Sequence, residues 1–150
     1  MIGPFGIRRA SNGDQRSSSL DGDGLECFHL GMATEQTYKG SCHCGKVNYE
    51  VKAELEQVYA CNCSICTKKG HLLTFVTPEK FSLLSGDAGL TDYQFHKKNI
   101  HHLFCPTCGI QSFMRGKKPD GSATVAINVR CLEGVDPGGL KVKQVDGRSF

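Results

Sequence analysis

The chain is organised around the stretch Cys61-Asn62-Cys63-Ser64-Ile65-Cys66, which places three thiols within six residues. Thiolates are soft ligands that select zinc among the common cellular metals, and zinc prefers four tetrahedral ligands. Three clustered cysteines therefore indicate a site with one coordination position left for water or a substrate. From local spacing alone, a closed site completed by His71 or by the distant Cys131 is an equal alternative.

Two further cysteine pairs flank this stretch and predict a second metal site. Cys42 and Cys44 are two apart in extended chain, so both sulfurs face the same way. Two thiols spaced by two residues and followed by glycine form a zinc knuckle, as in Cys105-Pro106-Thr107-Cys108-Gly109. A redox pair is the alternative, but it would require a thioredoxin-like βαβ setting that the sequence lacks. The two pairs together make a complete four-thiolate shell, which leaves an open group of Cys61, Cys63 and Cys66.

The remaining candidates are weaker. Cys131 ends an apolar predicted strand and is interpreted as a buried small hydrophobic residue rather than a ligand. His43 lies between two ligands and is expected to point away from the metal. His101 and His102 lie in a predicted strand, so at most one of their side chains can face a site. Three lysine pairs could bind an acidic ligand: Lys68-Lys69, Lys97-Lys98 and Lys117-Lys118. Scattered lysine pairs are more often found in solvated turns.

The composition is that of one globular domain in a reducing compartment. Of the 150 residues, 39% are hydrophobic and 22% are charged, which is ordinary for a soluble protein. Nine cysteines are an odd number and too few for a disulfide scaffold, so they indicate metal binding. No apolar run approaches the ~20 residues of a membrane helix, and no signal segment is visible, so we expect a cytoplasmic protein, with the nucleus as an alternative. A net charge of +3 and a pI near 8.4 do not indicate a dedicated nucleic-acid domain.

Residues 1–36 are predicted to be a disordered N-terminal extension, because they are polar and show no sustained apolar periodicity. This extension includes Cys27 and His29. Residues 37–150 are predicted to form one zinc-binding domain. No segment shows a helical stripe of three turns, so we expect an all-β, antiparallel fold with at most a short helical turn after Cys63. Segments rich in β-branched or aromatic residues predict strands at 47–51, 72–76, 81–84, 90–95, 100–104, 111–114, 124–129 and 140–145.

Three motifs occur in the order Gly40-Ser41-Cys42-His43-Cys44-Gly45, then Cys61–Cys66 with Lys69-Gly70, then Phe104-Cys105-Pro106-Thr107-Cys108-Gly109. This succession closely resembles the glutathione-dependent formaldehyde-activating enzyme family, also called the GFA or CENP-V domain. The similarity runs from about Tyr38 to Phe150. It includes two motifs similar to the family's tail, Asn128-Val129-Arg130-Cys131-Leu132 and Asp146-Gly147-Arg148.

The resemblance implies coiled antiparallel sheets stapled by zinc, with two zinc ions per chain. It implies a structural zinc on the residues that match Cys42, Cys44, Cys105 and Cys108. It implies a second, catalytic zinc on the residues that match Cys61, Cys63 and Cys66. The implied activity is that of a carbon-sulfur lyase, which in the synthetic direction joins glutathione and formaldehyde into S-hydroxymethylglutathione.

Within this interpretation, the partners are a small thiol and a small aldehyde, and the thiol becomes the fourth ligand of the second zinc. The Lys68-Lys69 pair could contact the carboxylates of the tripeptide, and His71 is the candidate general acid. The alternative function is a non-catalytic, zinc-stabilised module that binds protein or nucleic acid, since some animal relatives act at chromatin and on microtubules. Lysine pairs without interleaved aromatic residues give nucleic-acid binding little support. The sequence predicts no oligomeric state.

Overall fold

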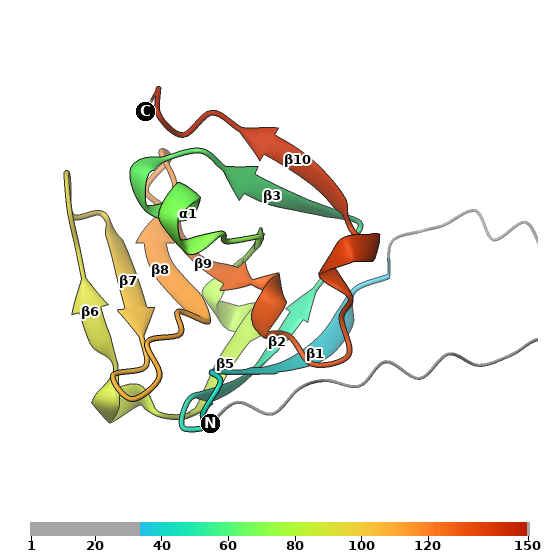
Figure 1. The fold of residues 1–150 in the computed structure, drawn as a ribbon. Helices are drawn as coiled ribbons and strands as arrows, with labels where there is room; N and C mark the ends of the chain where they lie inside the picture. Colours follow the sequence, from blue (N-terminus) through green and yellow to red (C-terminus); the bar gives the residue numbers. More distant parts are fainter. Residues whose placement is uncertain (1–33, 150) are drawn as a thin grey trace, which may run out of the picture. The chain divides into compact units, whose positions relative to one another are not determined.

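The structure is a computed structural model that describes residues 34–149, and this part of the chain is nearly all β (Figure 1). A three-stranded sheet has the order β1 (Gln36–Ser41), β2 (Asn48–Ala53) and β5 (Phe81–Ser85). A seven-stranded sheet has the order β10 (Lys141–Val145), β3 (Gln57–Cys61), β4 (Leu73–Val76), β9 (Ala123–Asn128), β8 (Phe113–Lys117), β7 (Ile100–Phe104) and β6 (Thr91–Tyr93). The predicted all-β fold is therefore confirmed.

The predicted helical turn after Cys63 is present as the α-helix α1 (Ser64–Lys69), which ends at Gly70 in the left-handed conformation. Within residues 34–149, no helix is both long enough and apolar enough to cross a membrane. Short 3-10 turns connect other elements: η1 (Pro78–Lys80), η2 (Asp87–Gly89), η3 (Val129–Cys131) and η4 (Pro137–Gly139).

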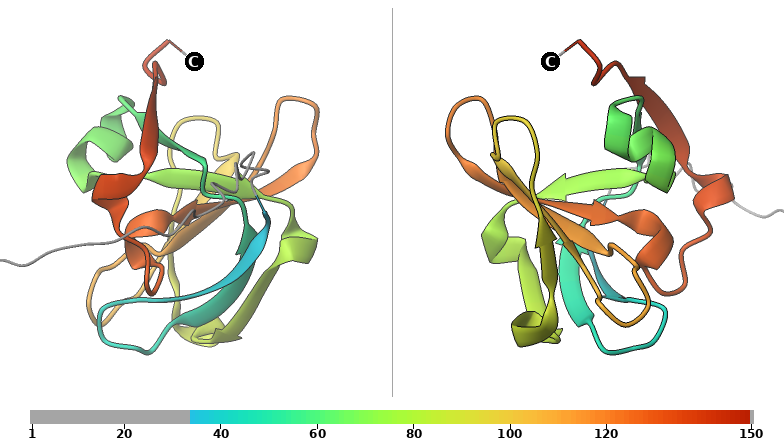
Figure 2. Two further views of the ribbon diagram at one scale, coloured as in Figure 1. Left: turned by 90° about the vertical axis from the view of Figure 1, so that its right-hand side faces the viewer. Right: turned by 60° about the vertical axis from the view of Figure 1, so that its left-hand side comes forward.

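One strand pair corrects the prediction of wholly antiparallel sheets. β10 runs parallel to β3, with Lys141 opposite Gln57 and Val145 opposite Cys61. Parallel neighbours cannot be joined by a tight hairpin, and the chain reaches β10 from β9 through η3 and η4. Both views in Figure 2 show β10 on the same side of the molecule as α1. Because of this pairing, the chain that leaves β10 emerges beside the three-cysteine stretch.

The other strands differ from their predicted bounds mainly at the ends. β7 has its predicted bounds, whereas the candidate at 90–95 is shortened to β6, and the candidate at 111–114 begins two residues before β8. Two strands were not predicted: β3, and β1, which starts at Gln36 inside the predicted extension. Residues 1–33 of that extension, including Cys27 and His29, lie outside the described residues.

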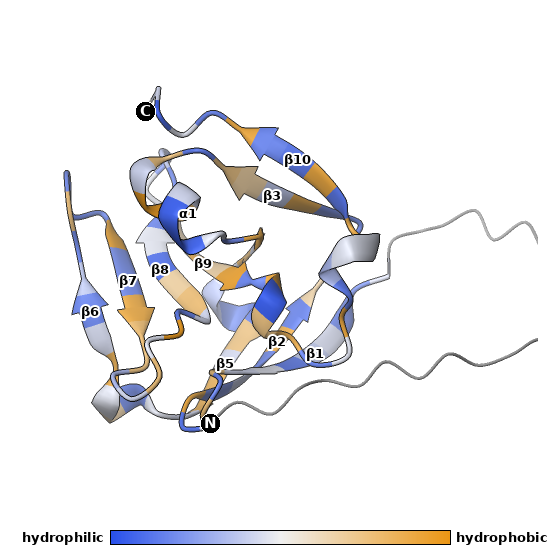
Figure 3. Ribbon diagram, in the orientation of Figure 1, coloured by the Kyte–Doolittle hydropathy of each residue, from blue (hydrophilic) through white to orange (hydrophobic). Residues whose placement is uncertain are grey.

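The main core contains an aromatic cluster of Tyr49, Phe81 and Phe113, with ring centroids 4.7–5.8 Å apart. Tyr49 and Phe113 are fully buried, and each such side chain contributes ~1.5–3 kcal/mol of hydrophobic stabilisation. At the edge of the seven-stranded sheet, β10 is largely exposed and carries more polar residues than apolar ones (Figure 3). Cys42 and Cys105 belong to the same buried core, so the first predicted metal group is attached directly to it.

Candidate metal centres and the adjoining cleft

Four cysteines that are far apart in sequence converge into one group, consisting of Cys42, Cys44, Cys105 and Cys108. Their Sγ atoms all lie within 4.8 Å of one another. The Sγ of Cys44 is 3.6 Å from the Sγ of Cys42 and 3.6 Å from that of Cys105. Tetrahedral zinc with Zn–S distances of ~2.3 Å separates its sulfurs by about 3.8 Å. The four-cysteine group therefore fits a closed zinc site, and no disulfide joins the cysteines of residues 34–149.

Both cysteine pairs of this group lie in tight turns. The N–H of Gly45 donates to the carbonyl of Cys42 at 3.1 Å, and the N–H of Gly109 donates to the carbonyl of Cys105 at 2.8 Å. The two glycines have φ values of 74° and 73°, which L side chains rarely adopt. The sequence thus provides glycine where each knuckle must reverse direction.

Hydrogen bonds in the four-cysteine group shift the thiol pKa values in both directions and connect its two turns. The backbone N–H of Lys46 lowers the pKa of Cys44, but burial and the neighbouring thiols outweigh it and raise that pKa to about 11. The backbone N–H of Ile110 lowers the pKa of Cys108 to about 6. The Nζ of Lys46, in the first turn, donates to the Oγ1 of Thr107, in the second, at 3.1 Å. The ligand pairs are therefore held together by protein contacts in addition to any shared metal.

The second group comes from a single short segment. Cys61 ends β3, Cys63 is the N-cap of α1, and Cys66 lies inside that helix. The three Sγ atoms lie within 4.8 Å of one another, and no further His, Cys, Asp or Glu of the described chain joins them. In particular, neither His71 nor Cys131 completes the shell. The three-cysteine group fits a zinc ion with one open coordination position.

The start of α1 favours a thiolate at Cys63. Burial opposes ionisation of this thiol, but backbone N–H groups of Cys66 and Ile65 donate to its sulfur and lower its pKa overall. Burial raises the pKa of Cys61 and of Cys66. Three adjacent thiolates also repel one another, so a bound divalent cation is what allows all three to ionise together.

The chain after β10 closes over the three-cysteine group and forms a C-terminal clasp of Asp146, Gly147 and Arg148. The Nδ2 of Asn62 donates to the Oδ1 of Asp146 at 2.7 Å. The backbone N and the Nε of Arg148 donate to the Oδ1 and the carbonyl of Asn62, at 3.1 and 2.9 Å. A Cβ on Gly147 would lie 2.3 Å from the Sγ of Cys61, so only glycine fits at this position.

A cleft of about 650 Å³ opens beside the three-cysteine group. Its lining includes three cationic side chains, those of Lys97, Lys98 and Arg148, and no carboxylate. Such a lining attracts an anionic ligand. The remaining lining residues are Cys61, Cys63, Ser64, Phe95, His96, Asn99, Ile100, His102 and Gly147.

The lysine pair that follows the three-cysteine stretch lies outside this cleft. The Nζ of Lys69 donates to the Oε1 of Gln111 at 2.6 Å and stands 5.1 Å from the ring centre of Phe104. Burial lowers the pKa of Lys69. Lys68 is exposed, and neither residue of the pair lines the cleft.

Of the two adjacent histidines in β7, one faces solvent and the other faces the cleft, in agreement with strand alternation. His101 is exposed and bonds Asp92, whereas His102 is only 4% exposed and lines the cleft. His71 is also buried, but it does not line the cleft. Burial first, then the nearby charges of Lys69 and His102, lower the pKa of His71 to about 4. His71 is therefore neutral at pH 7 and cannot serve as an imidazolium acid.

Two other sequence expectations concern residues beside the metal groups. His43 is exposed and belongs to neither cysteine group, as predicted. Cys131 also lies outside both groups, but it is only partly buried and lies in η3 rather than at the end of a strand.

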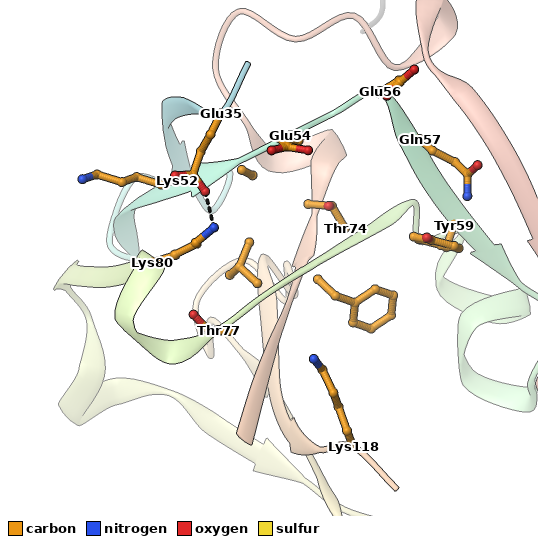
Figure 4. A pocket seen from close by; sticks show the side chains of 13 residues that line it. Glu35, Lys52, Glu54, Glu56, Gln57, Tyr59, Thr74, Thr77, Lys80 and Lys118 are labelled. Atoms are coloured by element: carbon orange, nitrogen blue, oxygen red, sulfur yellow. Dashed lines mark hydrogen bonds and ion pairs between the residues drawn. The ribbon is translucent and has the colours of Figure 1, made fainter. Parts of the chain in front are cut away.

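A second cavity of about 440 Å³ lies over β4 and η1 (Figure 4). The rings of Tyr59 and Phe75 meet edge to face here, with centroids 5.7 Å apart, and Lys80 pairs with Glu35. Acidic and basic side chains are mixed around it, and no cysteine or histidine belongs to its lining. This second cavity therefore offers no metal ligand of the kind found in the two cysteine groups.

Comparison with known proteins agrees with this arrangement. A family model described as "Glutathione-dependent formaldehyde-activating enzyme" matches residues 37–142, a range that contains all seven cysteines of the two groups. The chain is also similar to a Rhodobacter sphaeroides protein whose crystal structure was a Northeast Structural Genomics target. The two are 32% identical with a TM-score of 0.63, over 71% of this chain and 99% of that one. The chain belongs to the glutathione-dependent formaldehyde-activating enzyme family.

Proposed function

We propose that the chain is a zinc-dependent carbon-sulfur lyase that joins glutathione, or a similar small thiol, to formaldehyde or a similar small aldehyde. The observation that carries this proposal is the incomplete three-cysteine group on the wall of a cationic cleft. Family membership supports the same class of reaction. The lyase name describes the reverse direction, in which the carbon-sulfur bond breaks.

This proposal assigns two zinc ions to each chain, within a catalytic domain of residues 37–150. The four-cysteine group would hold a structural ion, and Cys61, Cys63 and Cys66 would hold the catalytic one. When bound, zinc with three thiolate ligands has a net charge of about −1, so it favours the deprotonated form of a bound thiol but polarises a carbonyl weakly. Activation of the aldehyde oxygen therefore falls to side chains of the protein.

The cations of the cleft are suited to hold the rest of the thiol substrate. Glutathione carries two carboxylates, and charge-assisted hydrogen bonds contribute roughly 1.5–3 kcal/mol each. Lys97 and Lys98 come from the loop between β6 and β7, and Arg148 comes from the C-terminal clasp. Because Arg148 is anchored to Asn62, between two cysteines of the group, its position relative to the reacting sulfur is set by the chain itself.

Cobalt substitution combined with a rate measurement tests this function. In the cobalt-substituted protein, glutathione should change the thiolate-to-metal absorption bands as its sulfur enters the shell. The zinc protein should form S-hydroxymethylglutathione faster than buffer alone does, as followed by NMR of labelled formaldehyde. Unchanged bands at saturating glutathione, together with no acceleration over buffer, would refute the enzyme proposal and favour the non-catalytic zinc-stabilised module.

A further inference from the structure

His102 is the histidine whose surroundings match a catalytic position. It lies on β7, is 4% exposed and lines the same cleft as Cys61 and Cys63. Its ring stacks on that of Phe95, with centroids 5.2 Å apart and an interplanar angle of 24°. The ring is thus held rigidly at the wall of the cleft.

A hydrogen-bonded chain determines which nitrogen of this ring carries the proton. Lys69 has only donors to offer, and its Nζ lies 2.6 Å from the Oε1 of Gln111. This contact requires the oxygen of the Gln111 amide to face Lys69, so the amide nitrogen faces His102. The Nε2 of Gln111 lies 3.3 Å from the Nδ1 of His102.

The amide nitrogen of Gln111 is a donor, so the Nδ1 of His102 must accept. A neutral imidazole that accepts at Nδ1 carries its proton on Nε2. Burial first, and then the charge of Lys69, lower the pKa of His102, which keeps the ring neutral near pH 7. Nε2 has no partner within the described chain, yet it is not among the enclosed unpartnered side-chain atoms, which are His71 Nδ1 and Ser112 Oγ. The Nε2–H of His102 is therefore an accessible donor at the cleft.

We propose that the Nε2–H of His102 donates a hydrogen bond to the aldehyde oxygen while the carbon-sulfur bond forms. The inference rests on the proposed function, since it requires a thiolate and an aldehyde in the cleft. The thiolate sulfur gives an electron pair to the carbonyl carbon, the π bond breaks, and the oxygen takes its electrons and the negative charge. The thiol proton has already gone to solvent, and water then protonates the oxygen to give the hydroxymethyl product.

In this step His102 is the catalytic residue, while Gln111 and Lys69 are positioning residues that hold its tautomer. A neutral donor fixed in advance at a developing oxyanion contributes roughly 10²–10³-fold in rate. The cleft also contains His96, but that side chain is exposed and no hydrogen bond within residues 34–149 fixes its tautomer. His102 is thus the better placed of the two histidines that line the cleft.

Substitution of His102→Phe tests the donor directly, because it keeps the stacking on Phe95 and removes the N–H. We expect kcat to fall about 10²-fold. The affinity for glutathione, titrated with the cobalt-substituted protein, should stay within about twofold. The matched control is His101→Phe on the opposite face of β7, which should keep kcat within about twofold. Wild-type kcat in a folded His102→Phe protein would overturn the inference.

Nitrogen-15 NMR tests the tautomer independently of activity. Wild-type His102 should be protonated on Nε2 at neutral pH. In Gln111→Glu, a carboxylate oxygen replaces the amide nitrogen, so the proton should move to Nδ1, and kcat should fall with intact melting behaviour. A wild-type ring protonated on Nδ1 in an active enzyme would overturn the inference alone. A wild-type protein no faster than buffer would overturn the proposed function and this role together.

Discussion

The four-cysteine and three-cysteine groups use the same side chain in two opposite settings. Cys42 and Cys105 are far apart in the chain, belong to the main core and are 2% and 1% exposed. Cys61 and Cys63 come from one short segment, are half-buried and line a cleft. Burial alone does not separate the groups, since Cys44 is exposed and Cys66 is buried. The comparison teaches that sequence separation and attachment to the main core, rather than ligand type, distinguish the proposed structural site from the proposed catalytic site.

The largest expected effect is that of Cys105→Ser in the four-cysteine group. Binding of a structural zinc contributes on the order of 10 kcal/mol, which is comparable to the whole net stability of a domain. We expect this variant to lose cooperative unfolding and the structural zinc. Circular dichroism melting and elemental analysis would measure both. A cooperative melt within a few degrees of wild type would show that this group does not staple the fold.

Cys63→Ser in the three-cysteine group should have a smaller effect on stability and a complete effect on activity. This variant should retain one zinc per chain and melt close to the wild-type temperature, because the lost ion does not link segments that are far apart in the sequence. The matched control is Cys131→Ser, which should retain both ions since Cys131 lies outside both groups. Equal melting of the Cys63 and Cys105 variants would contradict the division into structural and catalytic sites.

The two cysteine groups could be predicted from sequence because ligand spacing within each motif is local. Both predicted groups assemble with the expected members. The fold class was likewise predictable from short apolar segments bounded by turn residues. The parallel pairing of β10 with β3 was not, because nothing local specifies which strand a late segment will join.

The assembly of the rest of the cleft was not predicted, for the same reason. Lys97-Lys98 was one of three weak candidates for an acidic ligand, and nothing in the sequence placed it beside the cysteines. Lys97 and Lys98 lie in a loop whose nearness to Cys61 depends on the whole sheet order. Strand alternation indicated that at most one of the adjacent histidines could face a site, but it did not indicate which one. His102 is distinguished by its contact with Gln111. Gln111 was predicted to begin a strand, but it lies just before β8.

Gly147→Ala tests the contact between the C-terminal clasp and the three-cysteine group, which the spacing of the cysteines did not predict. The added Cβ would lie 2.3 Å from the Sγ of Cys61, so the C-terminal clasp must move away. We expect a loss of roughly 1–3 kcal/mol in stability, as for overpacked sites, together with weaker binding of one zinc. Chemical denaturation and chelator titration would measure the two effects. A matched control is Gly89→Ala, where a Cβ meets nothing within 4 Å and no change is expected.

Combined Lys97→Gln and Lys98→Gln substitution sharpens the assignment of the cleft as an anion site. The KM for glutathione should rise about tenfold with little change in kcat, because the two charges bind the ground state and the transition state alike. The KM for the uncharged thiol 2-mercaptoethanol should not change. Combined Lys117→Gln and Lys118→Gln, outside the cleft lining, is the control. An equal rise in KM for both thiols would argue against carboxylate recognition.

The smallest predicted effect concerns His71, a buried neutral histidine outside both metal groups. Its pKa is about 4 in the folded protein against 6.5 ordinarily, so below pH 6.5 the unfolded chain binds a proton that the folded chain does not. Stability should therefore fall as pH drops through this window, by about 1 kcal/mol between about pH 7 and about pH 5.5. Between these pH values, the size of the stability loss is determined by the pKa of His71 in the unfolded chain, because its pKa in the folded protein lies well below pH 5.5.

Replacement of His71 by Leu separates this contribution from acid release of zinc, which is common to both proteins. His71→Leu also removes a buried Nδ1 that has no hydrogen-bond partner in the described chain. Urea unfolding of both proteins at the two pH values gives four free energies, and their double difference isolates the histidine. We expect that double difference to be about 1 kcal/mol, with the wild type losing more. A value near zero would mean that His71 binds its proton equally well folded and unfolded, and that its site is open to water.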